Sequence, residues 1–221
     1  MEKIKRKIIV TGGCGYIGSH TIFQLIRDGY DIVSIDDNSR SNLFNLTNIS
    51  KFYKQEIINH KINICNFNEL EKVFNNYNNV EAIIHFAAFK AVGESMQKPL
   101  DYYENNIGSL VYLLEEMRDR KLDYFIFSSS CTVYGQADEL PITEKAPVKK
   151  AESVYGNTKQ IGEEIIKDAC KAYDLNSIAL RYFNPIGAHP SIKIGELHIG
   201  IPQNLIPYVT QTAAGIRKEL S

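Results

Sequence analysis

The sequence predicts an α/β fold built on a doubly wound parallel sheet. Along the first 184 residues, short apolar runs alternate with longer amphipathic segments. The first apolar run passes directly into a glycine-rich turn. Strands that alternate with helices form βαβ units around a parallel sheet. Because these crossovers are right-handed, helices are expected to cover both faces of the sheet.

Six apolar runs are predicted to be strands, and five amphipathic segments are predicted to be helices. The predicted strands are residues 8–10, 31–36, 57–64, 80–86, 124–127 and 178–183. The predicted helices are residues 17–28, 68–76, 101–119, 155–173 and about 203–215. Beyond residue 184, Asn-Pro, His-Pro and Ile-Pro pairs favour turns and break the alternation. We therefore predict a first domain of residues 1–184 and the start of an incomplete second region, residues 185–221.

Composition excludes several classes of function. With 25 basic and 26 acidic side chains the net charge is −1, so no nucleic-acid partner is expected. No apolar run approaches the ~20 residues that span a bilayer, and the N-terminus lacks a secretory signal. The four cysteines show no C-x-x-C spacing, so neither a zinc site nor a disulfide framework is expected. We expect a cytoplasmic protein with no membrane partner and no metal.

A glycine-rich segment, residues 11–18, contains the pattern G-x-G-x-x-G. Its glycines are Gly12, Gly13, Gly15 and Gly18. The pattern is weak alone, but it follows a predicted strand and opens a predicted helix, as in a Rossmann-like dinucleotide site. We expect Gly13 to allow the tight turn, Gly15 to let the main chain approach a pyrophosphate, and Gly18 to pack the helix closely on the sheet. The N–H groups at the helix N-terminus would then bind the phosphates.

An acidic residue, Asp36, ends the second predicted strand, 18 residues after Gly18. A carboxylate there accepts hydrogen bonds from both ribose hydroxyls of an adenosine. It would repel a 2′-phosphate, so NAD is favoured over NADP. Arg40 follows closely enough in the sequence to weaken that preference.

The segment Tyr155–Lys159 places a phenol and an ammonium on one face of a predicted helix. A free tyrosine has a pKa of ~10 and is a poor base at neutral pH. A nearby ammonium, together with a positive nicotinamide ring, would favour the phenolate. The spacing is weak evidence alone, but Ser130 follows the preceding strand, where its hydroxyl would face a cofactor crevice.

Six runs together resemble the extended short-chain dehydrogenase/reductase family, and within it the enzymes that epimerise UDP-sugars at C4. These runs are residues 10–20, 85–95, 97–106, 127–135, 155–159 and 180–190. They follow the family's order and span residues 8 to about 215. The segments Lys90–Ser95 and Gly187–Pro190 are typical of the epimerases.

The resemblance implies a tightly held NAD and the exchange of UDP-glucose with UDP-galactose through a 4-keto intermediate. Tyr155, as phenolate, would take the proton of the sugar 4-hydroxyl. Lys159 would keep Tyr155 deprotonated and bind the nicotinamide ribose, and Ser130 would assist the proton transfer.

The resemblance also assigns binding residues. Those for the cofactor, besides the glycines, Asp36, Tyr155 and Lys159, are Tyr16, Ile17, Asn38, Ser41, Asn63, Ile64, Phe86, Ala87, Lys90, Asn105 and Phe183. Those for the UDP-sugar are Lys90, Ser130, Tyr155, Asn184 and Asn204. Relatives commonly pair through the helices that correspond to residues 101–119 and 155–173, which makes a homodimer a candidate assembly.

The chain departs from the family in two places that affect the site. Asn63 stands where the family usually has an aspartate that bonds the adenine amino group, and an asparagine carbonyl could still accept that bond. Family chains continue well past residue 221 and build most of the UDP side there. We therefore expect much of the NAD site, an open substrate cleft, and apolar surface exposed at the cut.

Two other functions stay open. A 4,6-dehydratase would need an added acid/base pair, typically Asp-Glu, after the strand-end serine, where this chain has Cys131 and Thr132. A truncated dinucleotide-binding module would keep NAD and turn nothing over, because contacts to the phosphates often supply much of the affinity for a sugar nucleotide.

Overall fold

The protein contains one six-stranded, fully parallel sheet with the strand order β3-β2-β1-β4-β5-β6. The computed structural model describes residues 6–191, 193–197, 199 and 205–219. The strands are β1 (Lys7–Thr11), β2 (Asp31–Ile35), β3 (Ile58–His60), β4 (Val80–His85), β5 (Tyr124–Ser128) and β6 (Asn176–Leu180). This order confirms the predicted doubly wound fold, because the chain starts at the centre, winds outward to β3, and then returns to fill the other half.

Eight α-helices lie in the described part of the chain. They are α1 (Tyr16–Arg27), α2 (Phe44–Tyr53), α3 (Phe67–Asn75), α4 (Val92–Gln97), α5 (Pro99–Tyr103), α6 (Ser109–Arg120), α7 (Val154–Tyr173) and α8 (Leu205–Ala213). All five predicted helices are present, but α2 and α4 were not predicted. No helix among the described residues is long and apolar enough to cross a membrane.

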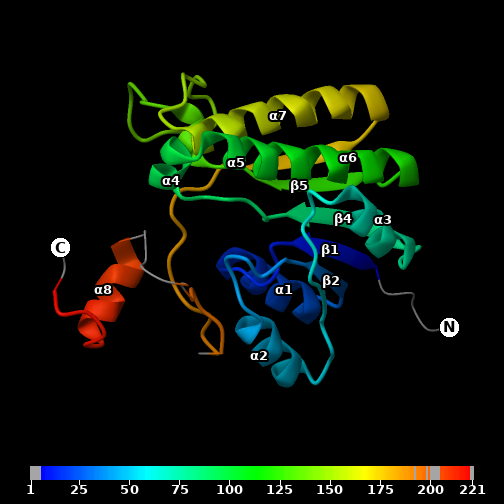
Figure 1. Cartoon of the computed structure of the whole chain (residues 1–221), viewed down its shortest axis with the longest axis horizontal. Helices are drawn as coiled ribbons and strands as arrows, with labels where there is room; N and C mark the ends of the chain where they lie inside the picture. The colour runs from blue at the N-terminus through cyan, green and yellow to red at the C-terminus, as the bar shows by residue number, and fades with distance from the viewer. Residues whose placement is uncertain (1–5, 192, 198, 200–204, 220–221) are drawn as a thin grey trace.

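Helices cover the two faces of the sheet in separate layers (Figure 1). On one face, α1 and α2 pack on side chains such as Ile8 and Val10 of β1. On the other face, α3, α6 and α7 pack on side chains such as Ile9. Ile9 and Val10 are both completely buried. Because side chains alternate along a strand, β1 contributes to the hydrophobic core on each face of the sheet.

The outer strands differ from the predicted ranges. Of the predicted strand 57–64, only Ile58–His60 pairs with β2, because the chain turns after His60 at the edge of the sheet. At the opposite edge, β6 begins at Asn176 and ends at Leu180, whereas residues 178–183 were predicted. The polar pair Asn176 and Ser177 joins the sheet because strand pairing uses main-chain groups, which are indifferent to side-chain polarity.

The predicted helix 101–119 contains a wide turn. Helices α5 and α6 are continuous through a π-helical turn, Glu104–Gly108. Within this turn, Asn106 accepts a 2.8 Å hydrogen bond from the Phe89 amide and donates a 3.0 Å bond to its carbonyl. The π turn thereby holds the segment that follows β4, and such turns often occur beside functional sites.

Candidate active site

A cleft of about 990 Å³ lies at the carboxyl ends of the strands, where the strand order reverses between β1 and β4. We call it the strand-end cleft. Parallel α/β sheets bind ligands at this position, and the volume is at the upper end of the range for small-molecule sites. Predicted residues that line it are Gly12, Gly15, Tyr16, Ile17, Gly18, Asp36, Ser41, Asn63, Ile64, Phe86, Ala87, Lys90, Asn105, Ser130, Tyr155, Lys159, Phe183 and Asn184.

The glycine-rich turn between β1 and α1 forms the floor of the cleft. Gly13 was predicted to allow the tight turn, and the left-handed conformation there is adopted by Gly12, with φ at 67°. A Cβ on Gly13 would lie 2.2 Å from the Ser34 hydroxyl, so this glycine is needed for close packing and does not line the cleft. Gly18 is as predicted: a Cβ there would lie 2.2 Å from the Gly12 carbonyl oxygen, so only glycine lets α1 approach the turn.

The N-terminus of α1 opens onto the cleft. Its N-cap residue is Gly15, and no side chain caps the helix there. The first N–H groups of a helix have no partner within the helix, and they carry the positive end of its dipole. This end of α1 can therefore bind a phosphate group.

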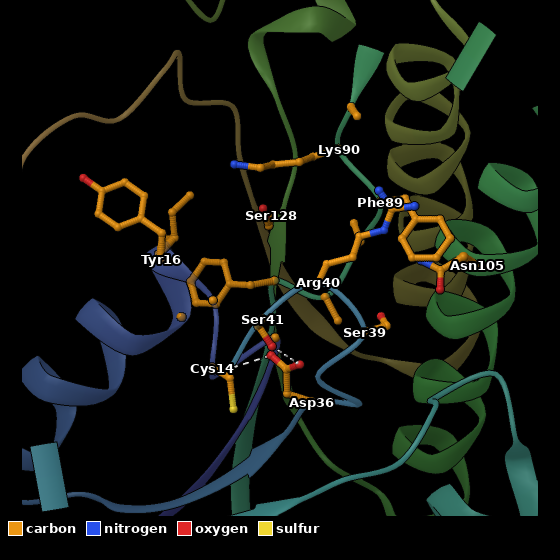
Figure 2. A pocket seen from close by; sticks show the side chains of 18 of the residues that line it. Cys14, Tyr16, Asp36, Ser39, Arg40, Ser41, Phe89, Lys90, Asn105 and Ser128 are labelled. Atoms are coloured by element: carbon orange, nitrogen blue, oxygen red, sulfur yellow. Dashed lines mark hydrogen bonds between the residues drawn. The ribbon is translucent and has the colours of Figure 1, made fainter. Parts of the chain in front are cut away.

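Asp36 lies directly beside the turn, at the end of β2 (Figure 2). Its carboxylate accepts hydrogen bonds from the Cys14 amide at 3.0 Å, the Asn38 amide at 3.0 Å and the Ser41 hydroxyl at 2.7 Å. Burial raises the pKa of this carboxyl group, and the Ser41 hydroxyl and the two amides lower it. Asn38 was predicted to contact the cofactor, but it does not line the cleft. Its side chain donates a hydrogen bond to the Ser41 hydroxyl, which in turn donates to Asp36.

Several predicted cofactor residues form the remaining wall. Asn63 is exposed at the rim, and its side-chain oxygen accepts a 2.9 Å hydrogen bond from the Cys65 amide. Phe86 and Ala87 follow the end of β4, and Asn105 reaches the wall from the π turn. The structure therefore gathers residues from three separate parts of the chain at this wall of the cavity.

The three predicted catalytic residues meet at the β5 side of the cleft. The Ser130 hydroxyl accepts a 3.2 Å hydrogen bond from the Thr132 amide and lies close enough to the Tyr155 phenol to lower its pKa. Lys159 is buried, with its ammonium 5.7 Å from the centre of the Tyr155 ring. That ammonium also donates a 2.8 Å hydrogen bond to the Ser128 carbonyl oxygen. Because all three line the same cavity, a hydroxyl group bound there can exchange a proton with the phenol or the serine.

The electrostatics of this group differ from the prediction in one respect. Burial raises the pKa of Tyr155 to about 12, and the Ser130 hydroxyl lowers it only in part. Burial also lowers the pKa of Lys159 to about 8. The side chains alone therefore do not make Tyr155 a phenolate at neutral pH. The sequence analysis expected two positive charges to favour the phenolate, the Lys159 ammonium and a nicotinamide ring. The nicotinamide ring belongs to the cofactor, so these residues cannot supply it.

Two sets of hydrogen-bonded polar side chains near the cleft were not predicted. His85 and Thr11 are buried and joined by a 2.7 Å hydrogen bond, and burial with the nearby Lys159 ammonium lowers the pKa of His85 to about 3. On α7, Glu163 accepts hydrogen bonds from the Ser129 hydroxyl and from the Arg181 guanidinium. A signal for Glu163 exists in the sequence, since it follows Lys159 by four residues and so shares its helix face.

The outer side of the cleft is open. Phe183 is 56% exposed and Asn184 is exposed, although both line the cleft. Lys90 forms an ion pair with Glu196 at 3.6 Å, and Figure 2 shows its side chain extended across the cavity. Asn204, predicted to contact the UDP-sugar, lies outside the described residues. Exposed apolar side chains also line the cleft, since Leu197 is 45% and Ile199 59% exposed.

A further group, also not predicted, joins two walls of the cleft. Arg40, in the loop after β2, makes a bidentate ion pair with Glu94 of α4, with N–O distances of 2.6 and 3.1 Å. Its guanidinium carbon lies 3.9 Å from the centre of the Phe89 ring. The pairing joins residues 54 positions apart in the sequence, so no local pattern could reveal it.

The pattern of the NAD dependent epimerase/dehydratase family matches residues 8–214. A UDP-glucose 4-epimerase of Dictyostelium discoideum is 47% identical over the whole chain, and UDP-glucose 4-epimerase 2 of Arabidopsis thaliana is 44% identical over 98% of it. The chain spans 64% and 62% of the length of these two relatives.

Solved structures agree with this result. The UDP-glucose 4-epimerase of Bifidobacterium longum, in complex with NAD+ and UDP, superimposes with a TM-score of 0.93 at 41% identity. The match covers 96% of this chain and 64% of that structure. The UDP-glucose 4-epimerase of Brucella ovis, in complex with NAD, gives a TM-score of 0.88 at 36% identity. The chain belongs to the NAD dependent epimerase/dehydratase family.

Proposed function

We propose that the strand-end cleft binds NAD. The residues present fit two parts of this group, its pyrophosphate and its adenosine ribose. The uncapped N-terminus of α1, with Gly15 at the wall, suits the pyrophosphate, and the Asp36 carboxylate suits the ribose hydroxyls of the adenosine. The solved relatives from B. longum and B. ovis carry NAD in their structures, which supports the same ligand here.

We propose that the reaction at this cleft is the epimerisation of a UDP-sugar at C4, which interconverts UDP-glucose and UDP-galactose. The observation that carries the proposal is the meeting of Tyr155, Ser130 and Lys159 in one cavity with the glycine-rich turn. NAD, when bound, would supply the hydride acceptor and donor for C4 of the sugar. The names of the relatives support this reaction and this substrate class.

In this proposal the proton is moved by residues of this chain. Tyr155 takes the proton of the sugar 4-hydroxyl and gives it back when the hydroxyl re-forms. Ser130 lines the cleft beside the phenol and orients the sugar oxygen toward it. Lys159 stabilises the phenolate across 5.7 Å and holds α7 against the end of β5. Residues of the exposed rim, Lys90 and Asn184, are proposed to contact the UDP-sugar.

Several features of the assembly remain proposals from the sequence. Residues 1–184 are proposed to form the NAD-binding domain, and residues 185–221 to form part of the substrate-binding region. Pairing of two copies through residues 101–119 and 155–173 is proposed and can be measured by light scattering. A cytoplasmic location also stays a prediction. A 4,6-dehydratase is disfavoured because Cys131 and Thr132, which line the cleft, supply no carboxylate there.

The test separates binding from turnover. The purified chain is denatured and the supernatant is analysed for released NAD, and a second sample is assayed with UDP-galactose and no added cofactor. We expect NAD with negligible turnover from the 221-residue chain, because it spans only 64% of the length of the D. discoideum relative. Turnover is expected when the chain is joined to the C-terminal third of the D. discoideum relative. Absence of turnover in that chimera, with NAD bound, would favour the binding module without activity.

A further inference from the structure

The Arg40–Glu94 ion pair connects two segments that flank the Asp36 end of the strand-end cleft. Arg40 lies four residues after Asp36, and Glu94 belongs to α4. The two N–O distances, 2.6 and 3.1 Å, show that both carboxylate oxygens are used. Glu94 is held in turn by the Tyr102 hydroxyl, which donates to it at 2.9 Å. The Glu94 carboxylate therefore holds the Arg40 guanidinium in place, and Tyr102 holds the carboxylate.

The position of Arg40 is important for the choice of cofactor. In dinucleotide-binding folds, an acidic residue after the second strand binds the ribose hydroxyls of NAD, whereas a nearby arginine accommodates the 2′-phosphate of NADP. This chain has both residue types within five positions. The sequence therefore leaves open which of them determines the specificity.

The structure shows where the guanidinium is directed. Figure 2 shows Arg40 extending from the loop of Ser41 toward Phe89, and its guanidinium carbon lies 3.9 Å from the ring centre. The edge of the guanidinium is occupied by Glu94 and one of its faces by Phe89. A phosphate binds an arginine through the same N–H edge that a carboxylate uses. Glu94 and a 2′-phosphate would therefore compete for the same donors.

We propose that Glu94 is a specificity-determining residue that holds Arg40 away from the nucleotide and so makes the cleft select NAD over NADP. This inference rests on the proposed function, because it assumes that the cleft binds a dinucleotide. The Asp36 carboxylate then faces the ribose without the Arg40 cation, and it would repel a 2′-phosphate. Arg40 remains 44% exposed, so its side chain has room to turn toward the cleft once Glu94 no longer holds it.

The test is the affinity of the whole chain, freed of nucleotide, for NAD and for NADP, measured by isothermal titration calorimetry. The variant Glu94→Gln keeps the shape and an acceptor for Tyr102 but loses the charge. We expect its affinity for NADP, relative to NAD, to rise about tenfold or more, which is the effect of one charge-assisted hydrogen bond. The double variant Glu94→Gln with Arg40→Met should lose this gain. The control Lys98→Gln removes a cation 3.8 Å from Glu94 and should change nothing.

Two results would overturn the inference. The first is a ratio of NADP affinity to NAD affinity in Glu94→Gln that equals the wild-type ratio. An increased ratio that persists in the double variant would overturn the inference equally. The other comes from Arg40→Met alone, which tests the idea even if Glu94→Gln is unstable. If this variant loses NADP affinity and keeps NAD affinity, then Arg40 already binds the phosphate while Glu94 is present. Failure of the proposed function is different, because the wild-type chain would then bind neither dinucleotide.

Discussion

The ammonium of Lys159 donates a 2.8 Å hydrogen bond to the main-chain carbonyl of Ser128, and this contact fastens the helix α7 to the end of β5. Tyr155 lies one turn earlier on α7, and Ser130 lies two residues after Ser128. The hydrogen bond therefore holds the phenol and the serine at the same side of the cleft before any ligand is bound. Its cost is a buried ammonium, whose pKa is lowered to about 8.

The buried ammonium predicts a specific dependence of stability on pH. The pKa of Lys159 is about 8 in the folded chain and 10.5 as the ordinary value, so between these pH values the unfolded chain binds more protons. The burial cost is complete below pH 8 and disappears as the pH rises toward 10.5. Relative to Lys159→Met, the free energy of unfolding of the wild-type chain should rise over this window by up to about 3 kcal/mol. Urea denaturation of both proteins from pH 7 to pH 10 measures this, and a constant difference would contradict a buried charge.

The close approach of α1 to the glycine-rich turn predicts a second effect on stability. Gly18→Ala places a methyl group 2.2 Å from the Gly12 carbonyl oxygen, so the helix must shift. We expect a loss of about 1–3 kcal/mol in the free energy of unfolding, the usual cost of overpacking. Gly93→Ala is the matched control, because a Cβ there meets nothing within 4 Å, and it should leave the stability unchanged or slightly higher. Equal effects of the two substitutions would mean that α1 does not pack as described.

Removal of the phenol should separate binding from chemistry. Tyr155→Phe keeps the ring beside Lys159 and removes only the hydroxyl. We expect NAD binding to be retained and the epimerase activity of the chimera described above to fall by about 10²–10⁴-fold, since general acid–base catalysis contributes that much. Turnover close to that of the unsubstituted chimera would exclude Tyr155 as the base.

Asp36 should control the affinity for NAD and the discrimination against NADP together. Asp36→Ala removes the carboxylate and leaves the Cys14 and Asn38 amides without their acceptor. We expect weaker NAD binding and a smaller preference for NAD over NADP. Titration with each dinucleotide tests this, and unchanged affinity for NAD would remove Asp36 from the binding site.

The sequence predicted most of the sheet because its strands are short apolar runs whose burial leaves a clear pattern. Helix α2 was missed because it is rich in Asn and in β-branched residues, which are weak helix formers, and only Asn45, Leu46 and Ile49 of it are buried. Helix α4 has six residues with only Ser95 buried, so it has no amphipathic repeat to detect. Both helices are stabilised by contacts with distant parts of the chain, which local propensity does not contain.

The predicted site residues were found by motif position, and the ones missed depend on long-range pairing. The glycines, Asp36, Tyr155 and Lys159 lie at fixed places relative to strand ends, so their meeting follows from the topology of the fold. The partners of Arg40 could not be derived that way, because Glu94 reaches it across the cleft from a helix that was not predicted. The pKa shift of Tyr155 could not be predicted from the sequence either, because its direction depends on how deeply the phenol is buried.

The central claim is that one cavity holds a dinucleotide with its adenosine at Asp36 and its nicotinamide at Tyr155. A crystal structure of the chain grown with NAD tests this most directly. The account predicts the adenosine ribose within hydrogen-bond reach of the Asp36 carboxylate, at about 2.6–3.2 Å, and the nicotinamide ring beside the Tyr155 phenol. Density for NAD outside the strand-end cleft, or within it but with the nicotinamide remote from Tyr155, would contradict the account.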